Sequence, residues 1–122
     1  MPPLEILQRL GGREIAAIVG AISATRFNKI PFLLDGFICG SAALVLKKMF
    51  SGSIDHVVSS HVSAEYAHKK MLKKLNKKPL ISLDLRLGEG SGAAVSLGII
   101  KSALACHSGM ASFDSAGVSN KD

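Results

Sequence analysis

The sequence has no tryptophan, and aromatic residues make up only 5% of its 122 residues. Much of the apolar content is alanine instead, which suits close packing of helices on a sheet. Long apolar runs are also missing: 15–24 holds ten residues and Asp35 interrupts 32–46, whereas a membrane-spanning helix needs about 20. We therefore expect one globular domain, or part of one.

Cysteine is scarce as well. Cys39 and Cys106 stand far apart without a C-x-x-C pair, so the chain shows no redox motif and no zinc motif. Unpaired cysteines fit a reducing compartment. The first ten residues include Glu5 and Arg9 and lack the apolar segment of a secretory signal peptide. We predict a cytoplasmic protein.

The net charge of +6 comes from one segment. Residues 68–78 (HKKMLKKLNKK) contain six lysines, which equals the net charge of the chain. With Met71, Leu72 and Leu75 on the other side, the spacing indicates an amphipathic helix with a solvated lysine face. Such a stripe can bind a polyanion, but no aromatic residue for base stacking and no arginine for base reading lies among the lysines. We predict no nucleic-acid partner and no membrane partner.

Strand and helix signals alternate along the chain. Short apolar runs typical of buried strands are separated by longer segments with helical spacing, and Asn28, Gly36 and Pro79 mark breaks between them. This alternation predicts an α/β fold with a parallel sheet flanked by helices. The expected helices cover 13–27, 38–50, 64–78 and 93–105, the strand candidates cover 30–35, 55–61 and 80–85, and 108–122 is a polar tail rich in Gly and Ser.

The loops after the three strand candidates are 34–36, 60–63 and 88–91. In parallel sheets, ligands bind at the carboxyl ends of the strands, in the loops that lead into the next helix. We therefore expect Asp35, Ser63 and Glu89 to lie at one edge of the sheet.

The third loop, GEGSG (88–92), surrounds Glu89 with small residues. It matches neither the dinucleotide fingerprint G-x-G-x-x-G nor a P-loop. Glycines do allow close approach of the backbone to a ligand and leave N–H groups free at a helix start. Glu89 is then either a turn residue favoured by the helix N-terminus or a general base, which must be ionised to accept a proton. Spacing alone leaves both interpretations open.

The histidines and Asp35 also permit two interpretations each. His61, Glu65 and His68 stand at i, i+4 and i+7, but His61 precedes the expected helix and no H-E-x-x-H motif is present. We predict no metal site, and interpret His61 as a polar loop residue and His68 as a solvated helix position. Asp35 ends a buried strand just before Gly36, where it serves as a ligand contact or as a helix cap.

Five segments, in order, carry a resemblance to a known family. They are GGREIAAIVGAI (11–22), IPFLLDGFICGSAAL (30–44), HVSAE (61–65), LDLRLGEGSGAAV (83–95) and HSGMASFDSAGVS (107–119). Together they closely resemble nicotinate-nucleotide:dimethylbenzimidazole phosphoribosyltransferases, over essentially the whole chain. Members of that family are considerably longer, and residues 1–122 resemble their last third, the C-terminal part of the phosphoribosyltransferase domain.

The resemblance implies a Rossmann-like α/β fold, here as a partial domain, in a homodimer. The implied reaction transfers phosphoribose from nicotinate mononucleotide to 5,6-dimethylbenzimidazole, giving nicotinate and the cobalamin precursor α-ribazole 5′-phosphate, with no metal and no cofactor. By resemblance, Glu89 is the general base that takes the proton from the benzimidazole nitrogen. The substrate-binding residues implied in the same way are Asp35, Gly36, Ser63, Leu87, Gly88 and Gly90.

Two other functions stay open. The chain could be a non-catalytic nucleotide-binding or assembly module that kept these loops without the N-terminal half of the active site. A basic nucleic-acid binder is the third hypothesis, and salt-dependent binding would be its signature. We expect these 122 residues alone to show little or no activity, because the family's second acidic motif and much of its benzimidazole pocket lie outside them.

Overall fold

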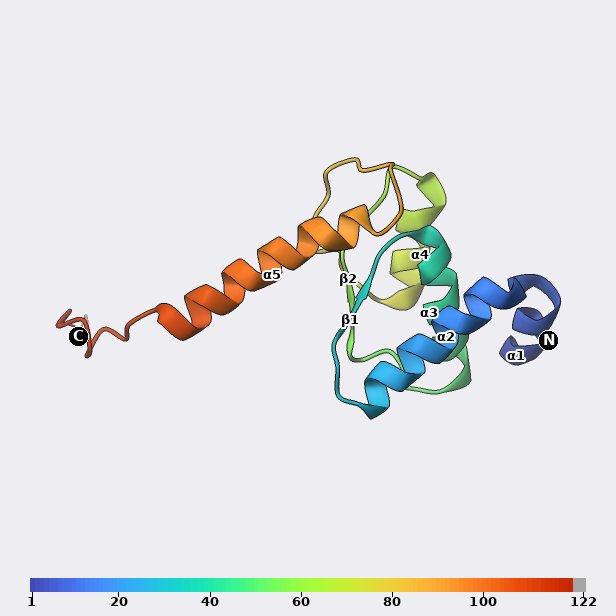
Figure 1. Cartoon of the computed structure of the whole chain (residues 1–122), viewed down its shortest axis with the longest axis horizontal. Helices are drawn as coiled ribbons and strands as arrows, with labels where there is room; N and C mark the ends of the chain where they lie inside the picture. The colour runs from blue at the N-terminus through green and yellow to red at the C-terminus, as the bar shows by residue number, and fades with distance from the viewer. Residues whose placement is uncertain (120–122) are drawn as a thin grey trace.

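The structure, a computed structural model, describes residues 1–119. Figure 1 shows α2, α3 and α4 packed beside a short sheet, with α1 at the N-terminal end beyond α2 and α3, while α5 extends away from this body toward the C-terminus. The elements are α1 (Pro3–Ile6), the π-helical segment η1 (Leu7–Gly11), α2 (Gly12–Phe27), β1 (Phe32–Leu34), α3 (Phe37–Met49), β2 (Val57–Ser59), α4 (Tyr66–Leu75) and α5 (Ser91–Gly109).

The four predicted helices are all present as α2, α3, α4 and α5. The lysine-rich helix is shorter than predicted and ends at Leu75, because Asn76 adopts a left-handed conformation (φ 55°) of the kind that commonly ends helices. The last helix is longer than predicted and runs to Gly109, so the expected tail from residue 108 begins inside it. Residues 120–122 of that tail lie outside the described residues.

The sheet confirms the predicted parallel arrangement. β1 and β2 pair in parallel with Phe32 opposite Val57, and α3 forms the crossover between them, as in a βαβ unit. The third strand candidate, 80–85, is wrong as a strand: it forms a single parallel bridge, between His61 and Ile81. Asp84 adopts a left-handed conformation (φ 52°), which interrupts the extended backbone that a longer ladder requires.

The core lies where α2 and α4 pack against α3 and where these helices meet the two strands. Small residues in α3 allow this close packing: a side chain on Gly40 would overlap the sulfur of Met71 on α4. The buried apolar core consists of Ile22, Leu34, Ala42, Ala43, Leu46, Ile54, Val57 and Leu75. It fixes the carboxyl ends of both strands relative to the helices that follow them.

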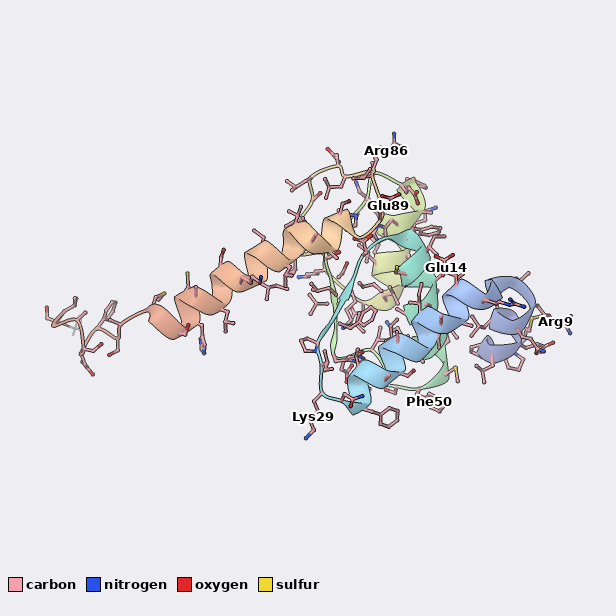
Figure 2. The ribbon with its side chains drawn as sticks, in the orientation of Figure 1. Arg9, Glu14, Lys29, Phe50, Arg86 and Glu89 are labelled. Carbon is pink, nitrogen blue, oxygen red and sulfur yellow. The ribbon has the colours of Figure 1, made fainter. Side chains whose placement is uncertain are left out.

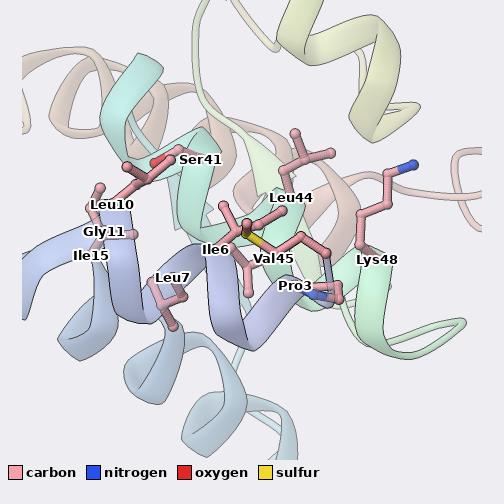
Figure 3. A pocket seen from close by; sticks show the side chains of 11 residues that line it. Pro3, Ile6, Leu7, Leu10, Gly11, Ile15, Ser41, Leu44, Val45 and Lys48 are labelled. Carbon is pink, nitrogen blue, oxygen red and sulfur yellow. The ribbon is translucent and has the colours of Figure 1, made fainter.

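Two apolar surfaces remain uncovered within residues 1–119. One is on α5, which buries only Gly92 and Ser96; its exposed large apolar residues are Val95, Leu97, Ile99 and Leu104. The other is a groove of about 500 Å³ between the N-terminal helices and α3 (Figure 3). Within the same residues, no helix is both long and apolar enough to cross a membrane.

Candidate active site

A cleft of about 640 Å³ lies beside the loops that follow β1 and β2 and the loop that precedes α5. Three of its lining residues, Glu14, Arg86 and Glu89, are labelled in Figure 2. The predicted residues that line it are Asp35, Gly36, Ser63, Gly88, Glu89 and Gly90. The prediction that Asp35, Ser63 and Glu89 lie together is therefore confirmed, although it concerns their position and not their roles.

Leu87 is the predicted site residue that the structure does not bring into this cleft. It is absent from the lining residues, and its side chain is 75% exposed.

Asp35 connects the end of β1 to the start of α5. Its Oδ1 atom accepts a hydrogen bond of 2.9 Å from the backbone N–H of Ala93 and lies 3.6 Å from Nδ1 of His61. The expected use of Asp35 as a helix cap is confirmed, for a different helix from the one that follows it, and its use as a ligand contact stays a prediction. The carboxylate lines the cleft, but the helix it caps is α5, 58 residues further along the chain, and not α3.

His61 is packed directly against the first turn of α5. Its ring is 4% exposed, and its Nδ1 atom lies 3.1 Å from the hydroxyl of Ser60. A Cβ atom at Gly92 would overlap the His61 ring, so glycine is required there for space. His61 precedes α4 as expected, but it is buried and holds α5 in place.

The loop that carries Glu89 has an unusual backbone. Gly88, Glu89 and Gly90 have successive φ angles of 76°, 55° and 79°, a left-handed conformation that glycine adopts freely and glutamate rarely does. The Glu89 side chain is exposed and, within residues 1–119, takes part in no hydrogen bond that would explain it as a cap. Unfavourable backbone angles of this kind cluster at functional sites.

Two of the helix N-termini beside the cleft, those of α3 and α5, differ in what they can bind. At α5, the N–H groups of Ser91, Ala93 and Ala94 already donate to Gly88, Asp35 and Gly90. At α3, residues 36–39 line the cleft and no side chain caps the helix. Since an uncapped helix N-terminus attracts anions, an anionic group in this cleft is better bound at α3 than at α5.

His68 is buried, and its prediction as a solvated helix position is wrong. Its exposed fraction is 0%, because it lies one turn before Leu72 and two turns before Leu75, on the buried face of α4. The backbone N–H of Ser63 donates a hydrogen bond of 2.9 Å to Nδ1 of His68. Burial, and then the neighbouring His61, lower the pKa of His68, so the ring is neutral near pH 7.

Sequence reasoning did not single out several lining residues. Arg86 and Glu65 lie within the segments that carry the family resemblance, so their positions beside Glu89 and Ser63 were a usable signal. Glu14 comes from α2 and Cys39 from α3; both also lie within resemblance segments, but neither follows a strand candidate. Burial raises the pKa of the Cys39 thiol, which keeps it protonated and poorly nucleophilic. Around the cleft, the carboxylates of Glu14, Asp35, Glu65 and Glu89 outnumber the single guanidinium of Arg86.

Comparison with known proteins identifies the family. A family model described as "Phosphoribosyltransferase" matches residues 1–118. The chain belongs to this phosphoribosyltransferase family. A relative from Rhizobium rhizogenes is 56% identical over 119 residues, covering 98% of this chain and 35% of the relative. One from Ruegeria pomeroyi is 59% identical over 117 residues, covering 96% and 35%. Both are named nicotinate-nucleotide–dimethylbenzimidazole phosphoribosyltransferase.

A solved structure confirms the fold. The crystal structure of nicotinate-nucleotide-dimethylbenzimidazole phosphoribosyltransferase from Thermus thermophilus is 39% identical, with a TM-score of 0.90 over 99% of this chain and 36% of that one. The partial α/β domain of this phosphoribosyltransferase chain is therefore confirmed. The chain spans about 35% of the length of the curated relatives it matches.

Proposed function

We propose that this chain provides one wall of an active site that transfers phosphoribose from nicotinate mononucleotide to 5,6-dimethylbenzimidazole. One observation carries the proposal. Asp35, Ser63 and Glu89 come from three separate segments and meet in one cleft, in a chain more than half identical to relatives named for this reaction.

Different residues of the cleft would suit different parts of the substrates. The uncapped first turn of α3 at Gly36 would bind the 5′-phosphate, with Ser63 beside it. Glu89 would accept the proton of the benzimidazole ring N–H. The carboxylates around the cleft would also stabilise positive charge that develops on the ribose as its bond to nicotinate weakens.

The proposed reaction exchanges one C–N bond for another. The bond between ribose C1′ and the pyridine nitrogen breaks, and its electron pair stays on that nitrogen and neutralises its positive charge. The second benzimidazole nitrogen donates its lone pair to C1′, while the ring N–H proton moves to the Glu89 carboxylate. The products are nicotinate and α-ribazole 5′-phosphate.

A chimaera tests this proposal. In it, residues 1–122 replace the matching segment of the Rhizobium rhizogenes relative, and release of nicotinate and formation of the ribazole product are followed by chromatography. We expect turnover by the chimaera and little or none by the 122 residues alone, because the remaining walls of the site lie elsewhere in the longer protein.

Both possible failures are informative. Strong turnover by the 122 residues alone would contradict the incomplete site. A folded chimaera that binds nicotinate mononucleotide without turnover would favour the alternative, a non-catalytic nucleotide-binding module.

We further propose a homodimer in the cytoplasm. The apolar side chains exposed on α5 need cover, and burying such surface is the usual driving force of dimer formation. Within residues 1–119 both cysteines are free, which suits a reducing compartment. Light scattering should give twice the monomer mass for the chimaera. Ile99→Lys with Leu104→Lys should give the monomer mass, and Lys101→Ala on the same helix should not. A wild-type monomer at all concentrations would contradict the dimer.

A further inference from the structure

His68 is a polar side chain in a position where an apolar one would be expected. It lies in the first turn of α4 and is fully buried, together with Leu72 and Leu75. A buried polar group destabilises a protein unless it is hydrogen-bonded, so the contacts of this ring call for an explanation.

The contacts of His68 lead to the wall of the cleft. Its Nδ1 atom accepts the backbone N–H of Ser63 at 2.9 Å and lies 3.0 Å from the Ser63 hydroxyl oxygen. A backbone N–H can only donate, so Nδ1 is the acceptor in this hydrogen bond and the proton of the neutral ring is assigned to Nε2. Nε2 is buried and has no hydrogen-bond partner within residues 1–119, so the Ser63 contact is what satisfies the ring. Protonation at Nδ1 would remove the acceptor and break this hydrogen bond.

A second hydrogen bond involves the hydroxyl group of Ser63. The Ser63 hydroxyl oxygen lies 3.4 Å from the backbone N–H of Glu65, which donates to it. Ser63 and Glu65 both line the cleft, whereas His68 does not. The ring of His61, which contacts α5, stands edge-to-face to that of His68 with the centroids 5.9 Å apart. His68 therefore lies between the α4 core and the cleft wall.

We propose that His68 is a positioning residue: its Nδ1 atom fixes the backbone at Ser63 and, with it, the place of Ser63 and Glu65 in the wall of the cleft that binds nicotinate mononucleotide. The proposal rests on the proposed function, because it assumes that nicotinate mononucleotide occupies this cleft. A merely structural histidine would fill space in the core, and its loss would lower stability without changing the affinity for one particular substrate.

Two substitutions separate these roles. In His68→Asn, the amide oxygen occupies the place of Nδ1, since both atoms are bonded to Cγ, and it can accept the Ser63 N–H. In His68→Leu, the side chain stays apolar and buried, but the acceptor is lost. His56→Leu is the matched control, because His56 is also hydrogen-bonded in the protein, to Ile22 O at 2.9 Å and Thr25 Oγ1 at 3.1 Å, but does not line the cleft.

Steady-state kinetics of the chimaera provide the test. We expect His68→Leu to raise the KM for nicotinate mononucleotide by about three- to tenfold, the factor for one hydrogen bond of ordinary net strength, with little change in the KM for dimethylbenzimidazole. His68→Asn should restore the KM to near the wild-type value. His56→Leu should lower the melting temperature and leave both KM values unchanged.

The other possible results would contradict either the positioning role, the hydrogen bond or the proposed function. If His68→Leu keeps the wild-type KM, or if His56→Leu raises it equally, the positioning role is wrong while the proposed function stands. If ¹⁵N NMR of the chimaera finds Nδ1 of His68 protonated near pH 7, the hydrogen bond itself is wrong. Absence of turnover in the wild-type chimaera would overturn the proposed function and this inference with it.

Discussion

Glu89→Gln in the chimaera should lower kcat by about 10²- to 10⁴-fold, the usual contribution of a general base. Glutamine keeps the shape and reach of glutamate but cannot accept the benzimidazole proton. The KM for nicotinate mononucleotide should change little, because the phosphate is assigned to other groups, at Gly36 and Ser63. Glu5→Gln is the control: Glu5 on α1 forms an ion pair with Arg9 on η1, at 2.9 Å, and does not line the cleft, so kcat should not change.

Benzimidazole substrates of different acidity provide a second test of the general-base role of Glu89. A benzimidazole with an electron-withdrawing substituent loses its ring proton more readily and needs the general base less. The loss of kcat in Glu89→Gln should therefore be smaller with such a substrate than with dimethylbenzimidazole. An equal loss with both substrates would indicate that Glu89 acts by charge or position and not as a proton acceptor.

Near-normal turnover of Glu89→Gln would instead support the turn interpretation. The backbone then gives a second measurement. Glu89 has a φ of 55°, which suits glycine better than glutamate. If Glu89 were only a turn residue, Glu89→Gly should be as active as the wild type and at least as stable. If it is the base, Glu89→Gly should be stable but inactive.

The parts of the fold that sequence predicted well depend on local patterns. The helix α3 is apolar enough to be recognised between Gly36 and the Ser51–Gly52 break, and the strands on either side are short apolar runs. Parallel pairing followed from the helix between them. The strand candidate at 80–85 failed because only its first residues pair. The left-handed conformation of Asp84, which interrupts the strand, could not be predicted from any local sequence pattern.

The residues of the candidate site also fall into those that local sequence patterns predicted and those that they did not. Asp35, Ser63 and Glu89 were found because each follows a strand candidate, and the rule for parallel sheets brings such residues together. Glu14 was not found, because it reaches the cleft from α2 through tertiary packing. The burial of His68 could have been predicted, since it is spaced four and seven residues before Leu72 and Leu75. Because histidine is polar, it was not counted with the apolar residues that define the buried face of the helix.

Gly92→Ala should destabilise the protein, although alanine is the better helix former. In an exposed helix interior, glycine to alanine stabilises by about 1 kcal/mol. At Gly92 the added methyl group would overlap the His61 ring, and that ring is buried and held beside Ser60 and Asp35. Overpacking of this kind costs about 1–3 kcal/mol, so the free energy of unfolding in urea should fall.

Gly98→Ala on the same helix is the matched control, because there the change in the free energy of unfolding should have the opposite sign. Within residues 1–119, and apart from its chain neighbours and the backbone of its own helix, nothing lies within 4 Å of the place that its Cβ would take, so the substitution should stabilise by about 1 kcal/mol. Gly92→Ala should also lower kcat, because a displaced α5 carries with it the loop that holds Glu89, whereas Gly98→Ala should not. If both variants were equally stabilised, the first turn of α5 would not be packed on His61, and the close contact between Gly92 and the His61 ring would be wrong.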